Sequence, residues 1–476
     1  MEKIHNAALK ILNEIGMKIE SEKAIELLRG VGCIVDKDTM IVRFPPTVVQ
    51  TYVDKMRRDY SDETRKPARM AVRYSHVRFR TEEHKVHRDF TASSGGFCCS
   101  IYDLDGNRRI PTMDDVHRSI LLVNKLDGID YTGLPVSDQQ TDDALRPVAM
   151  AAELAKYTTK FGGVETFTKE DIPYVIEIGS IVKGGLEELK AEPILVGYGE
   201  ARSPLCLDRN MVEIFMDYIE RGFPQILDTM PCGGASAPVT TAGILALGIA
   251  ESLSGVVLGY SIDEDAVIGL DVTPSYVDMT SGIFQYGSVG RMPLLVARVQ
   301  MVSEYYGCPS GVHGGKTDSC FVNVQCGIEK AMSTVFPVLA GAVGIGTLGH
   351  IENAMTFSPQ QLVIDNEVIC AVRKMLRPIV VNDATLAIDV IRDVGIGGNF
   401  LGEPHTVNNF REELLLSDLF ESVPWESAHS QSAKGMDERA LRIAAEIWRE
   451  DPEPIVDTQK LKQIDRVVAD RKKSLQ

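Results

Sequence analysis

One unit recurs eight times between Gly128 and Val394, and this repetition limits the fold more than any other feature of the chain. Each unit is a short apolar run rich in β-branched residues, then a turn, then a stretch with helical periodicity. Strands that alternate with helices predict crossover connections and a parallel sheet. The runs are Ile129–Pro135, Lys160–Thr166, Ile194–Ala201, Pro224–Pro231, Asp265–Thr273, Cys308–Gly315, Ala342–Gly349 and Pro378–Asp383.

Eight such units over roughly 250 residues are typical of an α/β fold of one kind, the closed (β/α)8 barrel of the TIM type. We predict that barrel over residues 128–396, with an N-terminal helical and β extension (1–127) and a C-terminal helical tail (397–476) packed on the barrel. In the extension, helices are expected within residues 4–30 and from 45 to 56, with strands at 41–44, 70–80 and 97–104. The tail should contain helices at 437–449 and 459–473.

The charge and cysteine content exclude several classes of protein. A net charge of -17 argues against a nucleic-acid partner. The nine cysteines include one adjacent pair, Cys98-Cys99, but no CxxC spacing and no regular framework, which is typical of reduced thiols in a cytoplasmic protein. No signal peptide is recognised at the N-terminus, and the longest apolar stretches, such as Val335–Val343, are too short to span a membrane.

Polar residues and glycines follow the predicted strands, where a barrel of this type carries its chemistry. Glu165 and Asp271 lie near the ends of the second and fifth runs; His313, Gly314 and Gly315 end the sixth, and His350 directly follows the seventh. Glycines let a ligand approach the backbone closely. As a group these residues predict a binding site, although any one of them could instead cap a helix or hydrogen-bond a neighbouring loop.

Other kinds of site fit the same loops less well. No HxH, HExxH or paired-Cys spacing lies near His313 or His350, and the one Cys doublet, Cys98-Cys99, lies outside the predicted barrel, so we expect no metal. The loops after the last two runs carry acidic residues and no Lys or Arg, which disfavours a phosphorylated substrate. Lys316 could act as a Schiff-base nucleophile, but beside two glycines we expect it to be solvated.

Aromatic residues gather near these loops, among them Tyr276, Phe284 and Tyr286. Aromatic faces beside carboxylates suit a cation that cannot donate hydrogen bonds, such as a quaternary ammonium group. Aromatic residues also pack routinely against barrel loops, so this pattern alone does not decide between a ligand site and core packing.

Six blocks resemble the trimethylamine methyltransferase family, in order along the chain: Ile4–Gly16, Leu104–Arg109, Gly233–Thr240, Gly314–Ser319, Leu362–Glu367 and Gly398–Thr406. Founding members of that family carry pyrrolysine on a barrel loop, here matched best by His313–Asp318. This chain has only the twenty standard residues, so it resembles the branch without pyrrolysine.

The resemblance implies a function and a set of partners. Members of that branch transfer a methyl group from a quaternary amine to a Co(I) corrinoid held by a separate protein. Glycine betaine is the first substrate expected, followed by proline betaine, carnitine or another betaine. A homo-oligomer is also implied. Two alternatives stay open: a barrel enzyme that uses Lys316 as a Schiff-base nucleophile, and a betaine-binding subunit without catalytic activity.

A betaine has two ends, so two kinds of group are expected around it. The trimethylammonium end should lie against Tyr276, Phe284 or Tyr286 and near Glu165 or Asp271. Its carboxylate should be bound by His350, the first candidate, or by His313 and the backbone N–H groups of Gly314 and Gly315.

Overall fold

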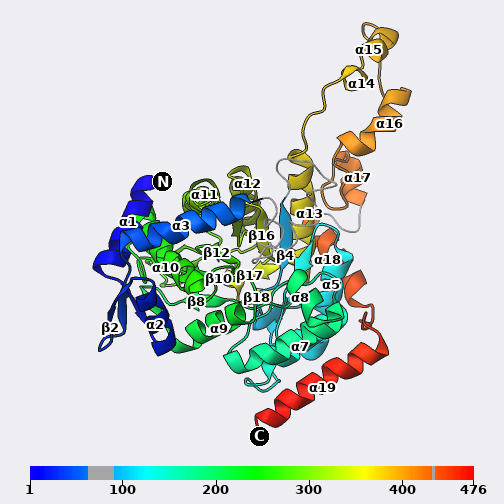
Figure 1. Ribbon diagram of the computed structural model, residues 1–476. Coiled ribbons are helices and arrows are strands. Elements are labelled where there is room, and N and C mark those ends of the chain that lie inside the picture. The colour runs from blue at the N-terminus through cyan, green and yellow to red at the C-terminus, as the bar shows by residue number, and fades with distance from the viewer. Residues whose placement is uncertain (63–89, 431–434) are drawn as a thin grey trace.

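The computed structural model describes residues 1–62, 90–430 and 435–476 and shows a mixed α/β fold (Figure 1). Its core is a row of parallel strands. On one side, β15 (Gly311–Val312), β16 (Gly344–Leu348), β4 (Thr91–Ser94) and β7 (Tyr131–Thr132) pair in that order. On the other side, β8 (Gly199–Ala201), β10 (Gln225–Thr229) and β12 (Ile268–Leu270) pair in that order.

Extended backbone joins the two halves of the row. Thr132 forms a parallel bridge with Phe161, and the Leu195 N–H donates to the Gly162 carbonyl at 3.1 Å. At the opposite ends of the row, the Arg298 side chain donates to Asp271, just after β12, and to the carbonyl of Gly311 in β15. Among the described residues no backbone ladder joins β12 to β15, so closure into a barrel stays a prediction.

The row of strands differs from the predicted set of eight by one exchange: β4 takes part in it, and the predicted strand at Pro378–Asp383 does not. Six of the eight predicted runs contain strands of the row, and the second contributes the bridge at Phe161. The run Pro378–Asp383 is wrong as a strand: its residues are exposed, have no strand partner and lead into α14 (Asp383–Leu386). Strand β4, from the segment expected to lie in the extension, pairs with both β16 and β7 instead.

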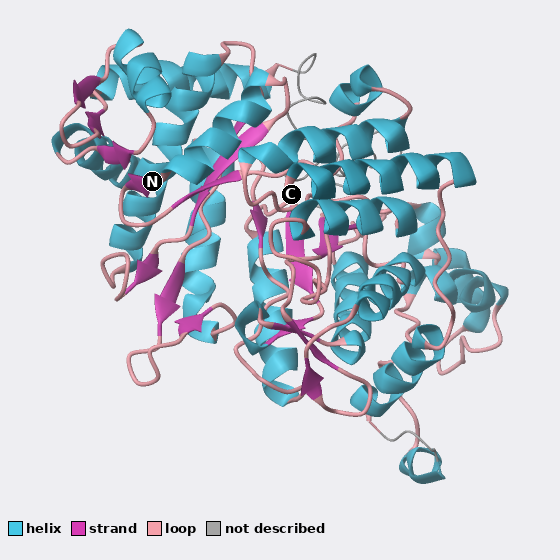
Figure 2. Ribbon diagram, turned by 90° about the horizontal axis from the view of Figure 1, so that it is seen from below, coloured by secondary structure: helices cyan, strands magenta, loops and turns pink. Residues whose placement is uncertain are grey.

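Helices surround these strands (Figures 1 and 2). Helix α5 begins with a capping box of Thr112 and Asp115. Helix α10 is apolar on every side because it lies in the core. Its length and composition would allow a membrane span, but 89% of its most apolar 18-residue stretch is buried inside the protein. The helices are α5 (Met113–Lys125), α6 (Arg146–Tyr157), α7 (Ile172–Lys183), α8 (Leu186–Ala191), α9 (Arg209–Glu220), α10 (Thr241–Ile262), α11 (Met292–Gln300), α12 (Val324–Leu339) and α13 (Pro359–Met375).

The N-terminal elements pack on α10 and share one apolar core with it. Strand β1 pairs with β3 and, in parallel, with β9 (Cys206–Leu207). The predicted helices and the strand at 41–44 are confirmed, whereas the predicted strand at 70–80 lies outside the described residues. The elements are α1 (Glu2–Glu14), β1 (Met17–Ile19), α2 (Glu22–Gly30), β2 (Ile34–Asp36), β3 (Ile41–Arg43) and α3 (Pro46–Ser61).

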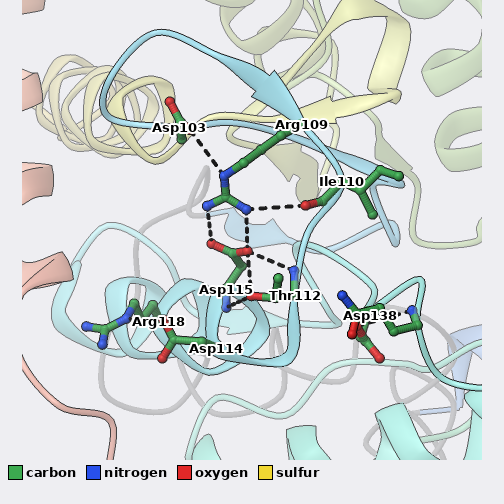
Figure 3. A network of polar contacts seen from close by, with 9 residues as sticks. Asp103, Arg109, Ile110, Thr112, Asp114, Asp115, Arg118 and Asp138 are labelled. Carbon is green, nitrogen blue, oxygen red and sulfur yellow. Dashed lines mark hydrogen bonds and ion pairs between the residues drawn. The ribbon is translucent and has the colours of Figure 1, made fainter.

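A small sheet lies beside the parallel row, in the order β17 (His350–Ile351), β18 (Thr356–Phe357), β5 (Ser100–Tyr102) and β6 (Arg108–Arg109). Figure 3 shows how its edge is held: Arg109 donates to both Asp115 carboxylate oxygens at 2.7 Å and to Asp103 at 3.1 Å. Burial acts to raise the pKa of Asp115, but the hydrogen bonds from Arg109 and Thr112 outweigh it and keep that pKa below its ordinary value.

The C-terminal part divides into a packed portion and a projecting one. Helix α18 (Met436–Trp448) packs on α13 and α5, and α19 (Thr458–Ser474) packs on α6 and α7, which confirms both predicted helices. Residues 377–416, with α14, α15 (Ile388–Val394) and α16 (Pro404–Glu413), extend away from the body before α17 (Trp425–Ser430) returns to it (Figure 1). The prediction that the tail packs on the barrel is therefore wrong for residues 397–416.

Candidate functional site

A cavity of about 170 Å³ lies among the strands of the parallel row. Seven separate segments of the row line it, from β4 through β16, so the cavity exists only because these strands come together. The lining residues are Ser93–Phe97, Tyr131, Gly133, Gly162–Glu165, Pro193–Tyr198, Pro224, Ile226, Val312, His313, Gly346 and Thr347.

The polar and aromatic groups of this lining define its chemistry. Glu165 supplies a carboxylate and His313 an imidazole, and both were predicted site residues. Phe97, Tyr131 and Tyr198 supply aromatic rings. Among the described residues, no lysine or arginine lines the cavity. Aromatic rings beside a carboxylate suit a bound cation.

Backbone conformations around the cavity are unusual. Phe97 and Leu195 have φ of 56° and Thr347 has φ of 66°, in the left-handed region that residues with a Cβ rarely adopt. All three line the cavity. Such residues persist only where the surrounding structure enforces them, and they gather at functional sites.

Glycines allow the strands to approach one another at one side of the cavity. A Cβ at Gly95 would lie 2.7 Å from the Gly133 nitrogen, and one at Gly133 would lie 2.8 Å from the Gly163 carbonyl oxygen. A side chain at either position would push two backbones apart. These glycines therefore set the width of the cavity near Phe97.

His350, the first candidate for binding the substrate carboxylate, lies behind the cavity wall rather than in it. A Cβ at Gly96, which lines the cavity, would be 2.7 Å from the His350 Cε1 atom. The imidazole is fully buried, and neither ring nitrogen has a hydrogen-bond partner in the described part of the chain. Burial, with the charges of Lys316 and Lys330, holds the pKa of His350 well below its ordinary value, so the ring is neutral.

The predicted aromatic residues lie on a hairpin outside the cavity lining. Tyr276, on β13 (Ser275–Val277), shares a hydrogen bond of 2.7 Å with Thr241, and Phe284, on β14 (Phe284–Gln285), is partly exposed. Tyr286 is covered by this chain's own cations: the Lys316 ammonium lies 4.1 Å from its ring centre and the Arg291 guanidinium 5.5 Å.

Lys316 and Arg291 are both buried, contrary to the expectation of a solvated Lys316. Lys316 is only 8% exposed. Arg291 donates to the carbonyls of Pro274 and Tyr286 at 2.7 and 2.6 Å, and burial lowers its pKa to about 10. Both cations contact the Tyr286 ring, so this chain's own side chains occupy the ring that was predicted to hold an ammonium group.

The remaining predicted residues have structural contacts of their own. Asp271 is buried and ion-paired with Arg298. The Gly315 N–H donates to the Gly346 carbonyl at 2.8 Å, and the Gly314 carbonyl accepts from Ser333 at 2.6 Å. None of these three residues lines the cavity.

No group of three or more His, Cys, Asp or Glu residues suited to a metal ion occurs within 1–62, 90–430 and 435–476.

Sequence reasoning missed the three aromatic rings of the cavity. Tyr131 and Tyr198 lie inside two predicted runs, where an aromatic residue among small neighbours was the available signal. Phe97 follows β4 and a Gly-Gly pair, the same pattern of glycines after a strand that marked the other loops. It was overlooked because β4, made mostly of Ser, Thr and Ala, lacks the β-branched pattern of the other strands.

Comparison with known proteins agrees with the resemblance seen in the six blocks. The chain matches the trimethylamine methyltransferase (MTTB) family over residues 1–476. It is 30% identical to the trimethylamine methyltransferase MttB of Methanosarcina barkeri, over 90% of this chain and 86% of that protein. It is also 28% identical to the glycine betaine methyltransferase of Desulfitobacterium hafniense, over 88% and 85% of the two chains. The chain therefore belongs to the trimethylamine methyltransferase family.

Proposed function

We propose that this protein transfers a methyl group from a quaternary amine, with glycine betaine as first choice, to the Co(I) corrinoid of a separate protein. The observation that carries the substrate class is the cavity, whose described lining combines one carboxylate with three aromatic rings and contains no lysine or arginine. A cavity of about 150 Å³ holds a molecule the size of benzene, so this one suits a trimethylammonium group. Proline betaine and carnitine are the next candidates.

The carboxylate, the aromatic rings and the imidazole of the lining each have a role in this proposal. Glu165 and the rings of Tyr131, Tyr198 and Phe97 hold the trimethylammonium end. His313 binds the substrate carboxylate, since it is the only one of the four predicted donors that lines the cavity. The leaving group is a neutral tertiary amine, so the chain needs no general acid. Its task is to orient one N-methyl group toward the nucleophile and to exclude water.

The size of the cavity supports a corrinoid that is held by a partner protein and presented to the amine from outside. About 170 Å³ is far too small for a corrin macrocycle. When the partner presents it, the Co(I) corrinoid supplies the nucleophile that takes the methyl group. The proposal also includes closure of the parallel row into a (β/α)8 barrel and a cytoplasmic location. Lys316 lies outside the cavity lining, so no contact there favours a Schiff-base mechanism.

The test is to incubate the purified chain with Co(I) cobalamin and, in turn, glycine betaine, proline betaine, carnitine and trimethylamine. We expect the spectrum of methyl-Co(III) cobalamin with at least one betaine. Absence of methylation with every quaternary amine contradicts the proposal. Calorimetric binding of a betaine without methylation would instead assign a binding subunit.

The Glu165→Gln variant tests the site. Loss of the carboxylate should raise the half-saturating betaine concentration by about 10-fold or more, because removing one partner of a desolvated charge pair costs about 2 kcal/mol or more. Glu187→Gln, the same change on the exposed surface of α8, is the matched control and should leave saturation unchanged. Equal behaviour of the two variants would place the ammonium group away from Glu165.

A further inference from the structure

Residues 377–416 form an arm that has no core of its own. None of them is buried, and thirteen of the thirty-six exposed large hydrophobic side chains in the described chain belong to this segment. Ile379 and Leu401 are 91% and 81% exposed. Monomeric soluble proteins rarely expose apolar patches beyond a few hundred Å². Another surface must therefore cover the arm.

The arm is nevertheless folded into helices that it cannot stabilise by itself. Helices α14, α15 and α16 have 4, 7 and 10 residues and no buried side chain. Isolated helices shorter than about 12–15 residues are marginal in water. Every side-chain hydrogen bond found in the arm, such as Thr385 to the Val380 carbonyl, stays within six residues along the chain. The described residues of the chain do not supply the missing stabilisation, so we look to another molecule for it.

The size and composition of the surface point to a permanent partner. The exposed apolar side chains of the arm present on the order of 1,000 Å², which is what each chain contributes to a homodimer interface of about 2,000 Å². Transient interfaces are about as polar as the rest of a protein surface. A protein that must dock and leave, such as a carrier of a reactive group, would not require so apolar an arm. The arm has six acidic and three basic residues, which disfavours an anionic membrane.

A second exposed apolar surface lies on α12 in the described part of the chain. Val324, Ile328, Phe336 and Leu339 lie on one side of α12, with Phe321 just before the helix, and all five are exposed. In a two-fold assembly, each chain contributes both an arm and a receiving surface, so both are covered in one step.

We propose that residues 377–416 are a dimerisation arm that packs on a second copy of this chain. This proposal is independent of the methyl-transfer proposal, since it rests only on the burial and hydrogen bonding of the arm.

The test compares the masses of three full-length proteins by sedimentation equilibrium at micromolar concentration. The unmodified chain should be a dimer or a multiple of it. Ile379→Asp/Leu401→Asp should raise the dimer dissociation constant by at least about 100-fold, because two unpaired carboxylates would have to be desolvated. Ile15→Asp/Ile34→Asp changes two residues on the body, both 58% exposed, and is the matched control that should keep the original mass.

Circular dichroism shows whether each variant is folded, and the arm is far enough from the core for folding to survive. A monomeric unmodified chain, or an arm variant with unchanged mass, overturns the proposal. An arm variant that stays dimeric but loses methyl transfer to a corrinoid protein also overturns it, and assigns the arm to that protein.

Discussion

Helix α10 and the arm show two outcomes for apolar sequence in one chain. Seventeen of the twenty-two residues of α10 are buried between the N-terminal elements and the parallel strands. The arm is also rich in Ile, Val and Leu, yet none of its residues is buried. The difference lies in the neighbours, because apolar side chains leave water only where a second surface faces them. An unburied apolar segment with regular helices therefore indicates a partner.

The largest expected effect comes from placing the same charge in both regions. Leu253→Asp puts a carboxylate in the centre of α10, where the side chain is fully buried, and should destabilise the chain by more than about 5 kcal/mol and prevent folding. Leu401→Asp in the arm should leave the fold of each chain intact. Soluble yield and near-ultraviolet circular dichroism measure the contrast. An equal loss of soluble yield and of near-ultraviolet signal in both variants would mean that the arm belongs to the core of its own chain.

The second effect compares two ion pairs. Lys330 donates to Asp365 at 2.6 Å in a buried pair, whereas Arg392 and Asp389 form an exposed pair in the arm. Lys330→Met leaves the Asp365 carboxylate buried without its cation and should lower the free energy of unfolding by about 3–5 kcal/mol. Arg392→Met should change it by at most about 1 kcal/mol. Urea denaturation of both variants tests this, and a small effect of Lys330→Met would show that Asp365 is neutral.

The smallest effect is a dependence on pH. The pKa of Asp115 is below its ordinary value in the folded chain, so its contribution is present above the unfolded pKa, near 4, and is lost as pH falls further. Asp115→Asn should therefore lower stability by about 1 kcal/mol at neutral pH. The difference from the unmodified chain should shrink below pH 4. Asp389→Asn in the arm is the control, and a difference that persists in acid would contradict the role of the Asp115 charge.

The local pattern predicted most of the strands but placed one of them wrongly. Residues 378–383 and β4 differ in composition: the first is rich in β-branched residues and the second consists of Thr, Ala and Ser. Propensity therefore favoured the wrong segment. Strand β4 is held by its pairing with β16 and β7, which are far from it in sequence, so tertiary contacts outweigh its weak local preference.

The sequence predicted the candidate site only in part, because local patterns locate strand ends but not the contacts between distant segments. Glu165 and His313 were found because polar residues directly after strand patterns converge in a parallel sheet. Tyr276 and Tyr286 follow a strand too, but the chain turns there into a hairpin that carries them out of the cavity lining. The spacing of residues along the chain does not report the direction of that turn.

By itself, the sequence determined the alternation of strands and helices, the family, and Glu165 and His313 of the cavity lining, because these depend on local periodicity or on blocks of contiguous residues. Only the tertiary structure decided that β4 joins the row, that Phe97, Tyr131 and Tyr198 face one cavity, and that residues 377–416 leave the body. Those outcomes depend on which distant segments meet. The free energy gained from burial and backbone pairing depends on both segments of a contact, so the sequence of one segment alone does not predict it.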